Sequence, residues 1–151
     1  MDYLPITIKI VSTNILIVGG GKVATHKAQI LARFTNHATV ISPETTQELR
    51  ALPFHIKQKA FEPQDLDGVD LLFVCTGDHE LNHEIKRLAS ERHILTSVCD
   101  APSECDFISP AIYREENLTI AVGSDSRDVK RSIRVRNRIK ELIENGTLDI
   151  D

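Results

Sequence analysis

The amino-acid sequence predicts an α/β fold, in which a mostly parallel sheet carries helices on both of its faces. Short runs of β-branched and apolar residues alternate along the chain with segments of helical period. Several of these runs, such as ILIV and LLFVC, are apolar at every position, which is typical of strands buried on both faces of a sheet. No repeat or low-complexity tract interrupts the alternation.

Six segments have the strand pattern and four have the helical one. The predicted strands are 14–18, 38–42, 54–60, 69–75, 94–98 and 118–122. The predicted helices are 21–34, 43–52, 79–92 and 128–144, the last with an apolar stripe that should pack against another element. Pro102 and Pro110 bracket a loop-rich stretch, after which one predicted strand and one predicted helix remain. We therefore expect a sheet domain over 1–112 and a short strand–helix segment over 113–151.

The composition fits one compact domain. The chain has 151 residues, of which 41% are apolar and 26% charged, so it is too short for a two-domain oxidoreductase with a separate substrate domain. No apolar run approaches the ~18 residues of a membrane span, and Asp2 and Lys9 do not suit a signal peptide. The cysteines Cys75, Cys99 and Cys105 are odd in number and lack zinc-finger spacing. We expect a cytoplasmic protein with no membrane partner.

Positive charge is concentrated near the end of the chain. The net charge is −4, yet residues 130–140 contain six basic residues and no acidic one, so the rest of the chain has a net charge of −10. This asymmetry indicates either a surface for an anionic ligand or a solvated helix face. Because the protein as a whole is acidic, we expect no nucleic-acid partner.

The strongest motif lies between the first predicted strand and the first predicted helix. In ILIVGGGKVATHKA, Gly19, Gly21 and Ala24 match the pattern G-x-G-x-x-A. In this pattern Gly19 permits the tight turn, Gly21 lets a pyrophosphate approach the backbone, and Ala24 allows close packing of helix on strand. The phosphates then meet N–H groups at the positive end of the helix. The motif predicts a Rossmann-like fold with a dinucleotide site, and a purely structural glycine turn is the alternative.

The acidic residue that usually holds the cofactor ribose at the tip of the second strand is missing. The segment reads ATVISPE, so Ser42 and Pro43 occupy the tip and Glu44 follows. Ser42 or Glu44 can contact the ribose, whereas Lys57 and Lys59 lie on the third strand, too far along the chain to indicate a 2′-phosphate. The residues at this tip therefore do not decide whether the cofactor is NAD or NADP.

The segment from His79 to His83 reads H-E-x-x-H, the metalloprotease signature. Both histidines would share one helical face, while Leu81, Ile85 and Leu88 lie on roughly the opposite face. The histidines should therefore point to solvent, and no third ligand is evident. We expect an ordinary exposed helix and no bound metal, and a zinc hydrolase is the alternative.

Asp100 directly follows the fifth predicted strand, at the carboxyl edge where open α/β sheets bind ligands. A carboxylate at that edge, beside a nicotinamide, can serve as a general base. It can equally cap a helix or close an Asx-turn, because Asp-Ala-Pro favours turns. Spacing alone does not decide between these two roles.

Several segments, in order, resemble the precorrin-2 dehydrogenase family, which is the amino-terminal module of siroheme synthases. These segments are MDYLPI, VGGGKVATHKA, FEPQDLDGVDLLFVCTGD, Asn82 and VCDAPSECDFISPAI, and the resemblance covers about residues 1–122. It implies NAD-dependent oxidation of precorrin-2 to sirohydrochlorin in siroheme biosynthesis, with insertion of ferrous iron in members that have both functions. It also implies an NAD-binding domain over 1–112 and a homodimer in which 113–151 is the dimerisation segment.

The resemblance assigns the family's essential aspartate to Asp100, the catalytic residue. It implies cofactor contacts at the glycine turn, the helix start and the neighbouring strand ends. With the ribose candidates, the expected cofactor residues are Gly19, Gly20, Gly21, Lys22, Val23, Ala24, Ser42, Pro43, Glu44 and Thr76. Precorrin-2 carries eight carboxylates, so the basic segment 130–140 has a natural partner.

Two departures from the family affect the substrate site. Members usually have Gly-Gly-x-Ser-Pro after the sixth strand, whereas this chain has Asp125-Ser126-Arg127-Asp128-Val129. Asp125 and Asp128 can repel an anionic substrate, and Arg127 can compensate. Members also generally continue for several dozen residues, so we expect a shortened member whose iron insertion is the activity most weakened. The altered turn favours the alternative function, a non-catalytic dinucleotide-sensing or tetrapyrrole-binding module.

Overall fold

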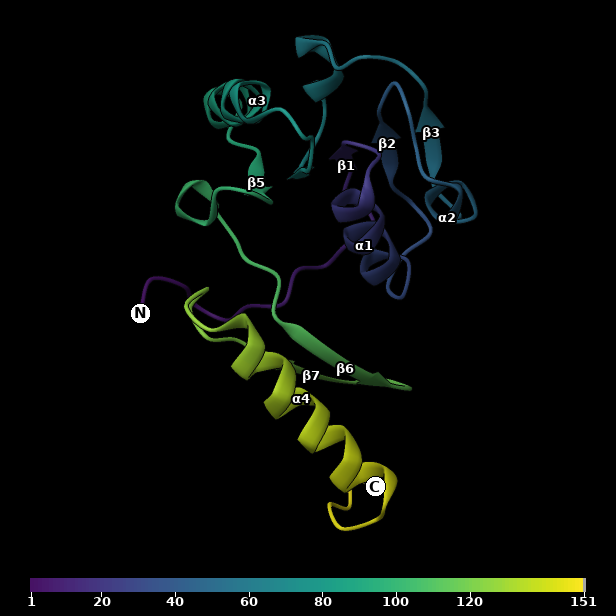
Figure 1. Ribbon diagram of the computed structural model, residues 1–151, viewed down its shortest axis with the longest axis vertical. Helices are drawn as coiled ribbons and strands as arrows, with labels where there is room; N and C mark the ends of the chain where they lie inside the picture. The colour runs from purple at the N-terminus through teal and green to yellow at the C-terminus, as the bar shows by residue number, and fades with distance from the viewer. Residues whose placement is uncertain (151) are drawn as a thin grey trace. The chain divides into compact units, whose positions relative to one another are not determined.

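The computed structural model describes residues 1–150, which form two compact units (Figure 1). The sheet unit is Thr7–Phe107, and the hairpin unit joins Met1–Ile6 to the chain from Ile108 onward. The predicted division was at residue 112, whereas the structure divides the chain at Phe107 and assigns its first six residues to the second unit. Among residues 1–150, no helix is both long enough and apolar enough to span a bilayer.

The sheet unit contains a five-stranded parallel sheet in the order β3-β2-β1-β4-β5. Its strands are β1 (Ile15–Val18), β2 (Thr39–Ile41), β3 (His55–Lys57), β4 (Leu71–Val74) and β5 (Leu95–Val98). In register, Ile17 of β1 lies between Val40 of β2 and Phe73 of β4. The first five predicted strands are thus confirmed, with shorter bounds.

Three α-helices and one 3₁₀ turn connect these strands, and a second 3₁₀ turn follows β5. They are α1 (Lys22–Leu31), α2 (Gln47–Arg50), α3 (His79–Glu91), η1 (Pro63–Leu66) and η2 (Pro102–Glu104). The predicted helix 43–52 was too long, because Thr46 is its N-cap and accepts the Leu49 amide at 3.1 Å. The residues before Thr46 therefore form a loop at the end of β2.

Alternate residues of each strand build two separate cores. Ile15 and Ile17 belong to a buried cluster with Ala24 and Ala28 of α1 and Leu49 of α2. The other two residues of β1, Leu16 and Val18, belong to a second cluster. That cluster also contains Leu66 of η1 and Ile85 and Ala89 of α3. Because successive strand residues point to opposite faces, helices cover both faces of the sheet, and the predicted fold class is confirmed.

The hairpin unit contains two antiparallel strands, β6 (Ala111–Glu115) and β7 (Leu118–Val122), and the helix α4 (Val129–Glu144) packs against both. The prediction of a single strand before this helix was wrong, because β6 was missed. Its turn carries no glycine signal: Glu116 itself has φ of 45°, a conformation in which Gly or Asn is usual. The segment therefore consists of a hairpin and a helix.

Asp125 fastens the start of the chain to the hairpin unit. Its Oδ1 accepts the amides of Asp2 at 2.8 Å and Tyr3 at 3.1 Å, and Arg127 Nε lies 3.3 Å from its Oδ2. The side chain is 4% exposed. These contacts explain why Met1–Ile6 belongs to this unit, and Asp125 presents little surface with which to repel a ligand.

We expect Asp125→Asn to loosen the first residues of the chain and to abolish the pH dependence of their protection from hydrogen exchange. The Asp2 amide, assisted by the Tyr3 amide and Arg127, holds the pKa of Asp125 below its ordinary value. A depressed folded-state pKa contributes stability that is complete above the ordinary pKa and is lost as pH falls through the folded-state pKa. The protection factors of the Asp2 and Tyr3 amides, which compare their exchange with the intrinsic rate at each pH, should therefore fall at acidic pH in the wild type and should already be low at neutral pH in the variant.

The matched control is Asp128→Asn, because Asp128 caps α4 through the Arg131 amide at 2.8 Å and asparagine can replace it as a cap. This variant should leave both exchange rates unchanged. Equal protection of the two amides in Asp125→Asn and in the wild type would contradict the assignment.

Candidate functional site

The glycine turn between β1 and α1 is packed tightly at its first two residues and open at its third. A methyl group on Gly19, whose φ is +126°, would lie 2.4 Å from the Cys75 carbonyl oxygen. One on Gly20 would lie 1.9 Å from the Glu44 carbonyl oxygen, whereas one on Gly21 would meet nothing within 4 Å. Positions 19 and 20 thus require glycine, because neighbouring loops leave no room for a side chain. Gly21 instead faces space that a ligand can enter.

The start of α1 offers unpaired backbone donors beside this open space. Gly21 is the N-cap of α1 and contributes no side chain, and the first helical turn contains no acidic residue. The first N–H groups of a helix have no partner within the helix and carry partial positive charge. Lys22 and Val23 are exposed there, whereas Ala24 is fully buried against the sheet. The arrangement suits a phosphate group.

A cavity of about 410 Å³ lies over the glycine turn at the carboxyl ends of the parallel strands. It brings together seven of the expected cofactor residues, namely Gly19, Gly20, Gly21, Ser42, Pro43, Glu44 and Thr76. It does not include Lys22, Val23 or Ala24 in its walls. Further wall residues that the sequence reasoning missed are Ala60, Phe61, Cys75, Gly77 and Leu81. Ala60 and Phe61 follow β3, so the rule that ligands bind at the carboxyl edge could have indicated them.

The two ribose candidates differ in what their side chains do. The Ser42 hydroxyl donates to the Glu44 carbonyl oxygen at 2.6 Å and is largely buried. The Glu44 side chain is exposed, and within residues 1–150 its carboxylate makes no ion pair. Lys59 is engaged by Glu62 at 2.5 Å and by Asp65 at 2.8 Å. Glu44 is therefore the side chain at this tip that can accept hydrogen bonds from ribose hydroxyls.

Thr76 is held by a buried amide. Asn82 of α3 is 1% exposed, its Oδ1 accepts the Thr76 hydroxyl at 2.5 Å, and its Nδ2 donates to the Thr76 carbonyl oxygen at 3.2 Å. These bonds fasten the loop after β4 to the helix that follows it. One wall of the cavity is thereby fixed in position.

Asp100 lies directly after β5 and contacts His79, the first residue of α3, through Oδ2 and Nδ1. Its side chain is 24% exposed. Two further pairs join the same helix to the same loop: His83 Nδ1 lies 3.2 Å from Glu104, and Lys86 Nζ lies 2.7 Å from Asp106. The histidines are exposed as predicted, but each faces a carboxylate, so the expectation of an ordinary exposed helix was incomplete.

Asp100 is not in the wall of the cavity but lies beside it. Val74 of β4 pairs with Val98 of β5, so Cys75 in the cavity wall neighbours Cys99, the residue before Asp100. The cavity and the Asp100 carboxylate therefore lie at the same edge of the sheet, at the ends of adjacent strands. Among the described residues, no group of three or more His, Cys, Asp or Glu side chains could hold a metal ion.

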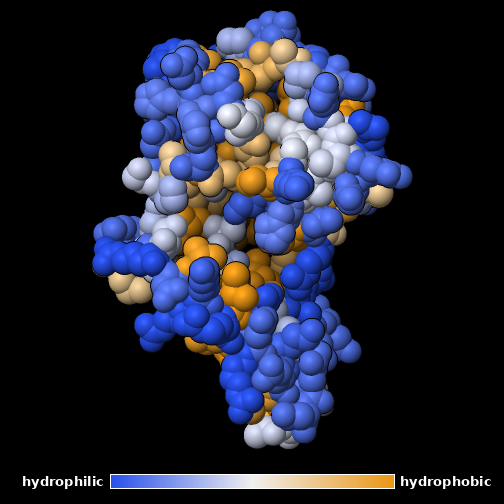
Figure 2. All heavy atoms as spheres, viewed as in Figure 1, coloured by the Kyte–Doolittle hydropathy of each residue, from blue (hydrophilic) through white to orange (hydrophobic). Residues whose placement is uncertain are grey.

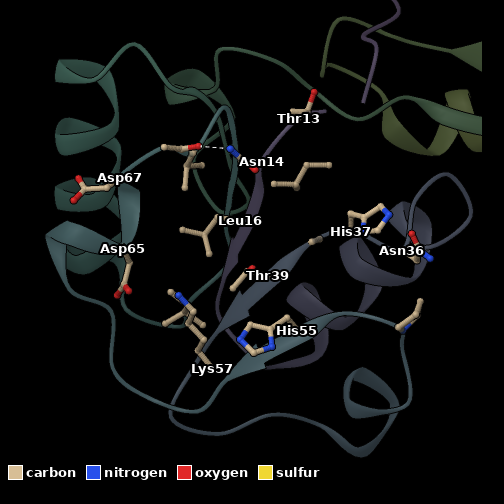
Figure 3. A pocket seen from close by; sticks show the side chains of 16 residues that line it. Thr13, Asn14, Leu16, Asn36, His37, Thr39, His55, Lys57, Asp65 and Asp67 are labelled. Atoms are coloured by element: carbon tan, nitrogen blue, oxygen red, sulfur yellow. Dashed lines mark hydrogen bonds between the residues drawn. The ribbon is translucent and has the colours of Figure 1, made fainter. Parts of the chain in front are cut away.

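A second cavity, of about 590 Å³, lies against β1, β2 and β3 (Figure 3). Leu16, Thr39 and His55, which are neighbours in register, line it from one strand after another. Its wall contains both Lys57 and acidic side chains from the η1 region. It contains none of the expected site residues, so the smaller cavity at the glycine turn is the candidate site.

Comparison with known proteins agrees with this geometry. A family model described as "Putative NAD(P)-binding" matches residues 6–111. The chain is 34% identical over 150 residues to a siroheme synthase of Photorhabdus laumondii, covering 97% of this chain and 32% of the relative. It is 35% identical over 147 residues to a siroheme synthase of Methylobacillus flagellatus, covering 95% and 32%. The chain thus spans about a third of the length of these relatives.

A solved structure named SirC, precorrin-2 dehydrogenase, shares the fold. The TM-score is 0.72 at 22% sequence identity, and the match covers 95% of this chain and 70% of that chain. Both the sheet unit and the hairpin unit thus have counterparts in a known architecture.

Proposed function

This chain belongs to the NAD(P)-binding family, and we propose that it is an NAD-dependent dehydrogenase that oxidises precorrin-2 to sirohydrochlorin in siroheme biosynthesis. One observation carries the proposal: a cavity built on the glycine turn lies one strand away from a carboxylate at the same edge of the sheet. The likeness to siroheme synthases over nearly the whole chain supports the choice of substrate.

NAD fits the residues around the cavity better than NADP. The open face of Gly21 and the first-turn amides of α1 suit the pyrophosphate. The Glu44 carboxylate suits ribose hydroxyls and would repel a 2′-phosphate, and Lys59 is already paired with Glu62 and Asp65.

Asp100 is the proposed proton acceptor. When bound, the nicotinamide supplies a hydride acceptor, and the oxidation removes two hydrogens from the substrate, so the second must leave as a proton. Asp100 Oδ2 faces His79, which leaves Oδ1 to receive that proton. His79 is a positioning residue in this proposal, because it restricts the rotation of the carboxylate.

The hairpin unit supplies a basic surface and an apolar one. Among the described residues, Lys130, Arg131 and Arg134 make no ion pair, so their charges are available to substrate carboxylates. Val129, Ile133 and Val135 of α4 are exposed, and Figure 2 shows orange hydrophobic residues among blue hydrophilic ones in the lower part of the view. We infer that this apolar surface mediates a homodimer. We also place the protein in the cytoplasm, because its three cysteines are free thiols.

The test is an anaerobic assay of the purified protein with precorrin-2 and NAD, which follows the absorbance of NADH. We expect stoichiometric formation of NADH and sirohydrochlorin, with NAD preferred over NADP by kcat/KM. Ferrous iron added to the same reaction tests insertion of the metal. NAD binding without turnover would overturn the dehydrogenase and indicate a dinucleotide-sensing module.

A further inference from the structure

Two cysteines lie side by side at the edge of the sheet that carries the candidate site. Cys75 follows β4 and Cys99 follows β5, and the paired residues Val74 and Val98 immediately precede them. The Cys99 amide donates to the Val74 carbonyl oxygen at 2.9 Å, which continues the ladder past the strand ends. Neighbouring strands lie about 4.8 Å apart. That separation is within the about 4.4–6.8 Å between Cα atoms that a disulfide bridges.

The two side chains also lie on the same side of the sheet. Both pack into the core cluster on the α1 side, Cys75 buried and Cys99 half-buried. The interaction between the two thiols and the Lys27 charge lower the pKa of Cys99, whereas the same interaction and burial raise the pKa of Cys75. Cys99 thus has the thiolate character of an attacking cysteine, and Cys75 that of its partner.

A small oxidant can reach the pair, because Cys99 is only half-buried and its neighbour Cys75 lines the 410 Å³ cavity. We propose that Cys75 and Cys99 are a modification site, an oxidisable thiol pair that a peroxide converts to a disulfide. The Cys99 thiolate attacks hydrogen peroxide and becomes a sulfenic acid, with release of hydroxide that is protonated to water. The Cys75 thiol then attacks that sulfur, and the second oxygen leaves as water. Two thiols are oxidised, and one peroxide is reduced to two waters.

Oxidation is coupled to the glycine turn through the backbone of Cys75. The Cys75 carbonyl lies so close to Gly19 that a methyl group there would sit 2.4 Å from its oxygen. Because β4 lies between β1 and β5, any shift of Cys75 toward Cys99 on oxidation moves the Cys75 carbonyl away from Gly19 and loosens the packing of the glycine turn. The oxidised form therefore binds the dinucleotide more weakly. This second part rests on the proposed cofactor site, whereas formation of the disulfide does not.

The first experiment treats the full chain with hydrogen peroxide and determines its mass and its linked peptides. The mass should fall by that of two hydrogen atoms, the peptides containing Cys75 and Cys99 should be joined, and dithiothreitol should reverse both changes. Cys105→Ser is the matched control and should behave like the wild type. Cys75→Ser should instead accumulate a sulfenic acid on Cys99 that dimedone traps. Unlinked peptides, or a linkage through Cys105, would overturn the assignment.

The second experiment titrates the reduced and the oxidised protein with NADH. We expect oxidation to weaken binding about tenfold in the wild type and in Cys105→Ser, and to have no effect in Cys75→Ser. Equal affinities of the reduced and the disulfide-linked wild type would overturn the coupling. Failure of the reduced protein to bind NADH would contradict the proposed cofactor site, and the mass measurement would still decide whether the thiol pair forms a disulfide.

Discussion

Replacing Asp100 with asparagine is expected to lower kcat for NAD-dependent oxidation of precorrin-2 by about 10²–10⁴-fold, while leaving the Kd for NAD unchanged. The carboxylate lies beside the cavity and not in its wall, so its loss removes the proton acceptor without removing a cofactor contact. Asparagine keeps the size of the side chain and its ability to hydrogen-bond His79. The measurement is stopped-flow formation of NADH together with NADH titration.

Glu104→Gln is the matched control, because Glu104 lies in the same loop and contacts His83 of the same helix. It should retain wild-type kcat. His79→Ala should lower kcat less than Asp100→Asn, since it frees the carboxylate without removing it. Full turnover in Asp100→Asn would refute the assignment of the proton acceptor.

Gly20→Ala is expected to destabilise the sheet unit and to weaken NADH binding severely. The added methyl group would lie 1.9 Å from the Glu44 carbonyl oxygen, so the loop after β2 or the glycine turn must move. Forcing extra atoms into a packed site typically costs about 1–3 kcal/mol. Thermal unfolding and NADH titration measure the two effects.

Substitutions at two other glycines distinguish an effect on the packing of the protein from an effect on NADH binding. Gly21→Ala adds a methyl group to open space, so unfolding should be unchanged while NADH binding weakens, because the methyl occupies the approach of the pyrophosphate. Gly123→Ala, in the hairpin unit, also meets no atom within 4 Å and should change neither property. Wild-type NADH affinity in Gly21→Ala would show that no dinucleotide lies on this turn.

Much of the fold was predictable because buried parallel strands leave a simple pattern. The runs that became β1 and β4 are apolar throughout, and the helices α1 and α3 begin where predicted to within a residue. The segment β6 was not predictable in this way. It has only three apolar residues and follows Pro110, and its pairing with β7 depends on a turn through Glu116 and Asn117, in which Asn117 is the one usual turn residue.

The candidate site was predictable where one backbone segment forms it and unpredictable where distant segments meet. The glycine turn and the β2 tip are continuous stretches, and the cavity contains most of their residues. The contact between Asp100 and His79 depends on how α3 lies against the loop after β5. Helical period correctly predicted that His79 is exposed, but period carries no information about the loop that an exposed side chain meets.

The anchoring of the first residues by Asp125 has a consequence for the order of folding during synthesis. The sheet unit is one continuous stretch and can fold as it leaves the ribosome. The contact between Asp2 and Asp125 joins residues 123 positions apart, so the other unit must wait until Asp125 has been made. Until then the first six residues have no partner in their own unit. A nascent chain that has emerged from the ribosome through Phe107, with Asp125 still inside the exit tunnel, should therefore carry a folded sheet while its first six residues are still open to proteases.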